Sequence, residues 1–227
     1  PKNPTQYCEL PRKNQKEIHP LDDHQVAALL EAAKGRPLEH LVTVALFTGM
    51  RQSELLGLTW DAVDFITGQI IVSKQLARLE HREKGLFASP KSGKGRTITA
   101  APLVLRSLQA QKRRQAEIQL RAGPAWSNPY GLVFTNQLGA PLEQRNVDYQ
   151  FRRITASAGI SGVRFHDTRH TYAVNAIRAG DDIKTVQGNL GHATAAFTLD
   201  RYAHFTEAMQ QASADRMEGF AKAVLNL

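Results

Sequence analysis

The 227 residues are 42% hydrophobic and 22% charged, which are ordinary values for a globular protein and exclude disordered and collagen-like classes. The sequence contains no run of about 18 apolar residues, which is the length needed to cross a membrane. Its single cysteine, Cys8, cannot form a disulfide within the chain, which fits a reducing cytoplasm. Lysine and arginine number 29 against 21 aspartate and glutamate, and the net charge of +8 indicates a polyanionic partner. A basic surface without such a partner is the alternative that charge alone leaves open.

The first 20 residues are polar, interrupted by prolines and without apolar periodicity, which predicts an extended linker over 1–20. The chain begins at Pro1 and not at a methionine, so we expect it to be a piece of a longer protein. Folded structure is expected to begin at Leu21.

Three helices are predicted after the linker. An acidic N-cap in Leu21-Asp22-Asp23 leads into apolar residues at helical spacing, and Gly35 closes this first helix. A second helix is predicted over about 38–48 and ends at Gly49, and a short third helix follows over 51–58.

The middle of the chain changes from helical to strand patterning. β-branched residues at 70–72 and 97–99 predict two or three antiparallel strands in a small sheet. Helical patterning then returns over about 103–121, over 143–158 and in a compact series from His166 to the end. The predicted fold class is a mainly α domain with one small antiparallel β-sheet.

The stretch 165–205 is rich in basic and nucleophilic side chains. A helix that opens at His166 places Arg169 one turn further on the same face. An imidazole beside a guanidinium suits the binding of a phosphate, because arginine offers a planar fork that matches two phosphate oxygens. An exposed polar helix start is the alternative interpretation.

His166 and His170 lie four residues apart, as in helical zinc sites. Such sites carry a glutamate base beside the first histidine, where this chain has Asp167, and the cation Arg169 stands between the two ring ligands. We therefore expect no metal at these histidines.

Two further stretches carry candidate groups. Gly191 ends a helix just before His192, and Tyr202 follows ten residues later. Nearby cations could stabilise a tyrosine phenolate as a nucleophile toward phosphorus. In the first half, Arg51 begins a helix and Glu54 lies one turn on, so that the carboxylate could hold the guanidinium. A solvated ion pair on a helix surface is the alternative.

Together these motifs resemble the catalytic domain of the tyrosine recombinases, or phage-type integrases, over residues 20–205. Order and spacing both agree, and the last stretch looks most like integrases of conjugative transposons. The motifs are Thr48-Gly49-Met50-Arg51 with Glu54, then His166-x-x-Arg169, Leu190-Gly191-His192 and Tyr202.

The resemblance implies a role for each matched residue in DNA breaking and rejoining. Arg51 and Arg169 would be the two catalytic arginines, and Glu54 would support Arg51. His166 would accept a proton, and His192 would hydrogen-bond the scissile phosphate.

The resemblance also implies a nucleophile and a general acid. Tyr202 would form a covalent 3′-phosphotyrosine with DNA and release a 5′-hydroxyl. A lysine in a turn of the small sheet would protonate the leaving oxygen, for which Lys91 is the first choice and Lys94 the second. The chemistry would need no metal, no ATP and no other cofactor.

The resemblance further implies how the chain is divided and what it binds. Residues 1–20 would link a missing N-terminal DNA-binding domain to the catalytic domain at 21–205, and 206–227 would form a helical tail that packs on its own domain or on a neighbouring protomer. The chain would bind double-stranded DNA and an accessory directionality factor. It would form a homo-tetramer on DNA and would be a monomer without DNA. Basic residues expected along DNA are Lys94, Arg96, Arg152 and Arg153.

Three other functions stay open at this point. A noncatalytic DNA-binding module could retain the fold, and a type IB topoisomerase-like enzyme would share the chemistry. A metal-dependent nuclease fits least, because the ligand set for a metal is poor.

Overall fold

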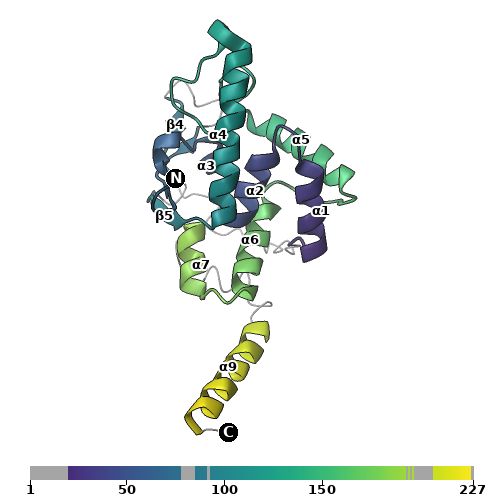
Figure 1. Ribbon diagram of the computed structural model, residues 1–227, viewed down its shortest axis with the longest axis vertical. Helices are drawn as coiled ribbons and strands as arrows, with labels where there is room; N and C mark the ends of the chain where they lie inside the picture. The colour runs from purple at the N-terminus through teal and green to yellow at the C-terminus, as the bar shows by residue number, and fades with distance from the viewer. Residues whose placement is uncertain are drawn as a thin grey trace, which may run out of the picture.

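A computed structural model describes residues 20–77, 85–90, 93–192, 194, 196 and 207–225, and helices make up more than half of these described residues. The predicted linker therefore lies outside the described residues, apart from Pro20. The mainly α class is confirmed (Figure 1). The helices are α1 (Asp23–Ala33), α2 (Glu39–Thr48), α3 (Gln52–Leu56), α4 (Pro102–Ala122), α5 (Gln144–Ser157), α6 (Asp167–Arg178), α7 (Ile183–Leu190) and α9 (Glu207–Leu225), with 3-10 turns at Trp60–Ala62 and Gly123–Ala125.

Within the described ranges, five short strands form two antiparallel sheets. The first has the order β1 (Val63–Asp64), β2 (Gln69–Val72) and β5 (Arg96–Thr99), in which Ile70 is the partner of Ile98. This is the predicted small sheet. The second sheet pairs β3 (Gln75–Leu76) with β4 (Phe87–Ala88).

Local sequence explains where the first helices begin and end. The Asp22 side chain accepts from the backbone N–H of Gln25 at 2.8 Å, and the Gln25 side chain accepts in return from the backbone N–H of Asp22, which makes a capping box. Helix α2 ends at Gly49, whose φ of 62° is left-handed. An added Cβ at this position would lie 2.4 Å from the ring of Tyr172, so glycine is required here for both its conformation and its size.

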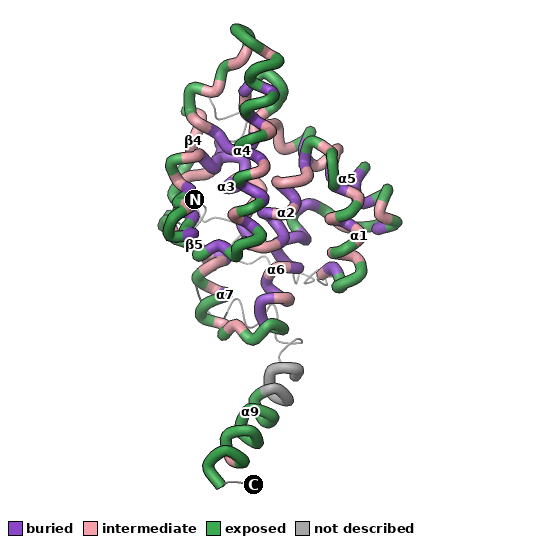
Figure 2. Tube along the Cα trace, viewed as in Figure 1, coloured by how far each residue is buried: buried purple, intermediate pink, exposed green. Residues whose placement is uncertain are grey.

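Helix α2 is the centre of the hydrophobic core, and it packs against α1, α4 and α6. Six of its ten residues are buried, which Figure 2 shows as a purple tube between green surface segments. A smaller cluster, which includes Val174, Ile177, Val186 and Leu190, packs α7 against α6. The C-terminal end of α7 is thereby fixed beside the C-terminal end of α2.

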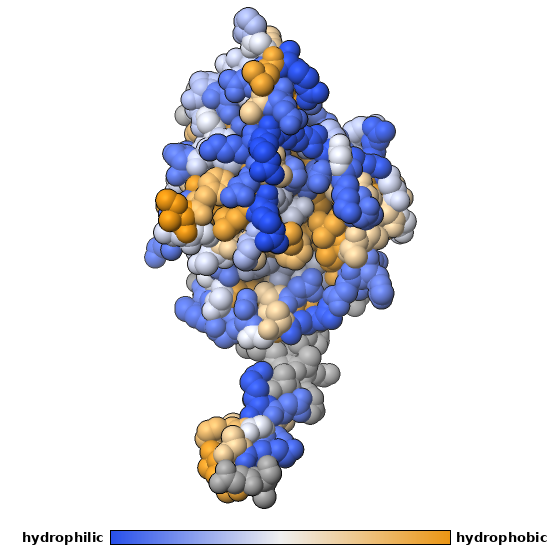
Figure 3. Space-filling view, in the orientation of Figure 1, coloured by the Kyte–Doolittle hydropathy of each residue, from blue (hydrophilic) through white to orange (hydrophobic). Residues whose placement is uncertain are grey.

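Helix α9 projects away from the rest of the protein in Figure 1. Met217, Phe220 and Val224 are each more than 60% exposed, and the end of the helix carries apolar surface in Figure 3. In the part of the chain that the structure describes, no helix combines the length and apolar character that a membrane span requires.

Candidate active site

Arg51 stands at the junction between α2 and α3. The left-handed turn at Gly49 redirects the chain, and Arg51 is the extended N-cap residue of α3. Glu54 accepts from the backbone N–H of Arg51 and from its Nη1, both at 2.8 Å. The Glu54 side chain is fully buried, so the pair is not the solvated surface ion pair that the sequence left open.

Glu54 also pairs with a second arginine, which the sequence did not predict. Arg96 at the start of β5 donates from Nη1 and Nη2 to the two Glu54 carboxylate oxygens, at 3.0 and 2.7 Å. The two guanidinium groups hold the pKa of Glu54 at about 2 against the opposing effect of its burial, so the carboxyl is ionised at neutral pH.

This environment does not fit the expectation that Arg96 lies along DNA. Its side chain is only 8% exposed, and its guanidinium is directed toward Glu54 and α7. One sequence signal could have indicated this, because Arg96 is two residues from Ile98 and shares its inward face of the strand.

Arg169 is buried in the first turn of α6, with 3% exposure. It donates from Nη1 to the carbonyl of Gly49 at 2.7 Å and from Nη2 to the carbonyl of Leu190 at 2.5 Å. The neighbouring residues of that turn, Asp167, Thr168 and His170, are buried as well. The alternative of an exposed polar helix start is therefore wrong.

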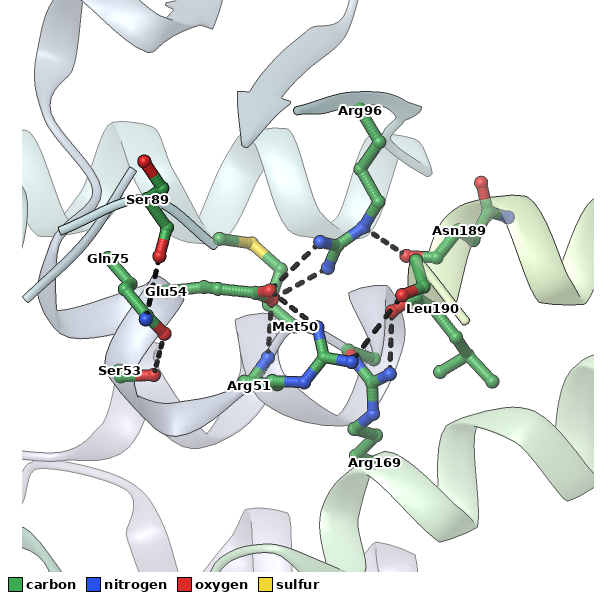
Figure 4. A network of polar contacts seen from close by, with 12 residues as sticks. Met50, Arg51, Ser53, Glu54, Gln75, Ser89, Arg96, Arg169, Asn189 and Leu190 are labelled. Carbon is green, nitrogen blue, oxygen red and sulfur yellow. Dashed lines mark hydrogen bonds and ion pairs between the residues drawn. The ribbon is translucent and has the colours of Figure 1, made fainter. Parts of the chain in front are cut away.

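Three arginines from three parts of the chain meet at the C-terminal end of α7. Arg96 donates to the carbonyl of Asn189 at 2.6 Å, Arg169 donates to Leu190, and Arg51 reaches Gly191 at 3.5 Å, as Figure 4 shows for the first two carbonyls. The last carbonyls of a helix have no partners within it, and positive charge is favourable there. His192 follows directly, with its backbone N–H bound to the carbonyl of Gln187.

The two predicted histidines flank the arginines. Partial loss of solvent and then the Arg169 and Arg51 charges lower the pKa of His192 to about 3. The pKa of His166 is lowered by the same kind of desolvation and then by Arg169. Both rings are therefore neutral at neutral pH, so His166 can accept a proton.

The zinc interpretation can be compared with the geometry of the histidine pair. The rings of His166 and His170 pack edge to face with 5.1 Å between centroids. Among the described residues, no group of three or more His, Cys, Asp or Glu side chains is arranged to hold a metal ion.

The predicted general acid and nucleophile, Lys91 and Tyr202, lie outside the described residues. The chain just before Lys91 is fixed to α3 through Gln75, which accepts from the Ser53 hydroxyl at 2.9 Å and donates to the Ser89 carbonyl at 2.8 Å (Figure 4). Lys94 is exposed in the turn that precedes β5.

Arg152 and Arg153 are both exposed on α5. Arg152 and His166 line the same cavity of about 800 Å³, between α5 and the segment 159–166. Gln52 at the start of α3 donates to Asp148 of α5 at 2.9 Å, which ties this cavity wall to the helix that follows Arg51. An exposed cationic helix thus adjoins the arginine and histidine cluster.

Comparison with known proteins identifies the relatives of this chain. The model of the phage integrase family matches residues 19–209. A "Tyrosine recombinase XerC-like" protein of Caldanaerobacter subterraneus subsp. tengcongensis is 32% identical over 202 residues, which cover 85% of this chain and 52% of that protein. An integrase of Streptomyces ambofaciens is 30% identical over 206 residues, which cover 87% of this chain and 52% of the integrase.

A solved structure supports the same relationship. The Tn1549 transposon integrase (residues 82–397, Y379F) in complex with transposon right end DNA superposes with a TM-score of 0.73 and 26% identity, covering 91% of this chain and 68% of that one. The chain spans about half the length of the first two curated relatives. Family match, sequence identity and fold agree that the chain belongs to the phage integrase family and has the fold of a tyrosine recombinase catalytic domain.

Proposed function

We propose that this chain is the catalytic part of a site-specific DNA recombinase that integrates and excises a mobile element. The observation that carries the proposal is the convergence of Arg51, Arg169, His166 and His192 on the junction between α2, α3, α6 and α7. The relatives are named recombinases and integrases, and the Tn1549 integrase was solved with transposon DNA, which supports DNA as the substrate here.

The reaction is an in-line displacement at phosphorus. The Tyr202 hydroxyl attacks the scissile phosphate and gives its proton to His166, whose lowered pKa leaves the ring free to accept it. The bond from phosphorus to the 5′-oxygen breaks, and Lys91, or Lys94 in its place, protonates the leaving oxygen. The phosphodiester is replaced by a phosphotyrosine ester, so the step is reversible and consumes no nucleotide.

Two arginines and a histidine stabilise the negative charge that develops on the phosphate oxygens during the reaction. Arg51 and Arg169 are anchored on carbonyls of Gly191, Gly49 and Leu190, so their positions do not have to be reorganised when charge develops. His192 stands beside them as a neutral hydrogen-bond donor.

Assembly follows from the chemistry of strand exchange, which joins four DNA strands. We infer a tetramer on DNA and a monomer in its absence, with the exposed apolar side of α9 packing on its own domain or on a neighbouring protomer. The linker 1–20 joins the catalytic domain at 21–205 to a preceding DNA-binding domain, and a directionality factor assists excision in the cytoplasm.

The test measures covalent adduct formation on a DNA duplex that carries the end of the element. A nick in this duplex lets the cleaved 5′ strand diffuse away. The wild-type chain is expected to form a covalent protein–DNA adduct that survives EDTA, and Tyr202→Phe to form none. Tyr130→Phe removes the hydroxyl of an exposed tyrosine outside the predicted motifs and is the matched control.

Two outcomes would contradict parts of this proposal. An adduct that persists in Tyr202→Phe would reject this nucleophile. Simple relaxation of supercoiled DNA without four-way junction products would point to a topoisomerase-like activity instead.

A further inference from the structure

We propose that Arg96 is a positioning residue. It holds Arg51 and the turn before His192 in the charge state and geometry that bind a DNA phosphate. The inference rests on the proposed function, because it assigns a role within the same site. Arg96 is nearly buried, and its guanidinium is occupied by Glu54 and Asn189, so it acts through its neighbours.

The first part of the role is the balance of charge around Glu54. One buried carboxylate lies between two guanidinium groups, so the three side chains together carry a net charge of +1. Without Arg96, the Glu54 charge would cancel that of Arg51, and a phosphate would meet a neutral pair. Because water is excluded from Glu54, its charge is poorly screened and has to be matched by protein groups.

The second part of the role is the geometry of the turn that carries His192. The Nε of Arg96 donates to the carbonyl of Asn189 at 2.6 Å, next to the carbonyls that Arg169 and Arg51 contact. Gly191 has a φ of +63°, and an added Cβ there would lie 3.0 Å from Nη1 of Arg96. Arg96 therefore packs directly against this turn and ties it to β5.

A role of Arg96 in stability alone and a role in positioning Arg51 predict different results for the same variants. A structural ion pair changes adduct formation only through the fraction of folded protein, which stays close to one for every variant assayed well below its unfolding temperature. A charge balance around Arg51 predicts that Glu54→Gln compensates for Arg96→Met, since the double variant keeps the local charge at +1. The two interpretations are therefore separated by a double-mutant cycle.

The experiment compares wild type, Arg96→Met, Glu54→Gln and the double variant in adduct formation on the nicked duplex. We expect Arg96→Met to slow adduct formation on the order of 10- to 100-fold, and the double variant to be at least about tenfold faster than Arg96→Met. Arg178→Met is the matched control, because Arg178 also pairs through both terminal nitrogens with a carboxylate, Asp23, on the exposed surface. Thermal unfolding of each variant verifies that it is folded.

A second measurement does not depend on recombination. The pKa of the His192 ring, followed by NMR in the protein without DNA, reports the positive potential at the phosphate position. We expect this pKa to be higher in Arg96→Met than in wild type and to return toward the wild-type value in the double variant.

Each result has a defined meaning. An Arg96→Met chain that forms adduct at the wild-type rate, or a folded double variant no faster than Arg96→Met, would overturn the positioning role. If wild type forms no adduct, the proposed function fails, and the His192 titration then decides whether Arg96 controls the charge of the site.

Discussion

His192 illustrates how single residues in the site depend on their surroundings. Desolvation of its ring, followed by the charges of Arg169 and Arg51, lowers its pKa to about 3. A histidine in an unfolded chain has a pKa of about 6.5. Protonation of this residue is therefore coupled to folding.

This coupling predicts a pH dependence of stability. As pH falls below about 6.5, the unfolded chain takes up a proton at His192 and the folded chain does not, so stability is complete above that pH and falls below it. We expect His192→Asn to reduce the slope of unfolding free energy between pH 6.5 and 4.5 by up to about 1.4 kcal/mol per pH unit, measured by urea unfolding. Glu54, with its pKa of about 2, affects stability only below that window. An unchanged slope in the variant would contradict the assigned environment.

The residues of the site differ in how far the sequence could predict them. Arg51 and Glu54 are three positions apart on one helix, so their contact follows from local geometry. The pairing of Glu54 with Arg96 spans 42 residues and depends on how β5 packs beside α3. Arg96 was expected along DNA, because the alternation that puts it on the inward face of β5 does not show which distant carboxylate it meets.

At the scale of elements, the end of α2 determines where the arginines lie. Gly49 stops the helix, supplies a carbonyl to Arg169 and starts the turn that leads to Arg51. Most helix boundaries could be predicted within one or two residues, because caps and glycines are local. The two-residue strands β3 and β4 could not, because so short a pair has almost no periodicity of its own.

Gly49→Ala tests the importance of this turn. The added Cβ would meet Tyr172 at 2.4 Å and Leu190 at 2.8 Å in a left-handed conformation, so we expect a loss of stability of about 3 kcal/mol. Gly35→Ala is the matched control, since Gly35 has a φ of +69° but open space around it, and its cost should be about 1 kcal/mol. Equal losses in chemical denaturation would show that the close packing at Gly49 does not matter.

At the scale of the whole molecule, the arginines fall into a buried group inside the site and an exposed group on the surface. Arg169 and Arg96 are buried and fixed to carbonyls or a carboxylate, whereas Arg152 is exposed and lines the cavity beside His166. The net charge of +8 indicated a polyanion but could not separate these two groups, because burial depends on the fold.

The exposed group predicts how DNA affinity depends on salt. We expect binding to a duplex to weaken steeply with salt, and Arg152→Ala to reduce the slope of log K against log salt by about one. Arg121→Ala, which removes an exposed arginine at the far end of α4, should leave the slope unchanged. Fluorescence anisotropy over a salt series measures both, and equal slopes in all three proteins would remove α5 from the DNA interface.

The projecting helix α9 has a consequence for the helix–coil equilibrium. Isolated helices of fewer than about 12–15 residues are marginal in water, and longer ones gain most of their stability by burying an apolar face. From 213 to 225 nearly every residue of α9 is exposed, and the helix contains Gly219. Its helical state therefore depends mainly on its own backbone until Met217, Phe220 and Val224 are covered. A surface that covers them supplies the free energy for helix formation as well as a contact.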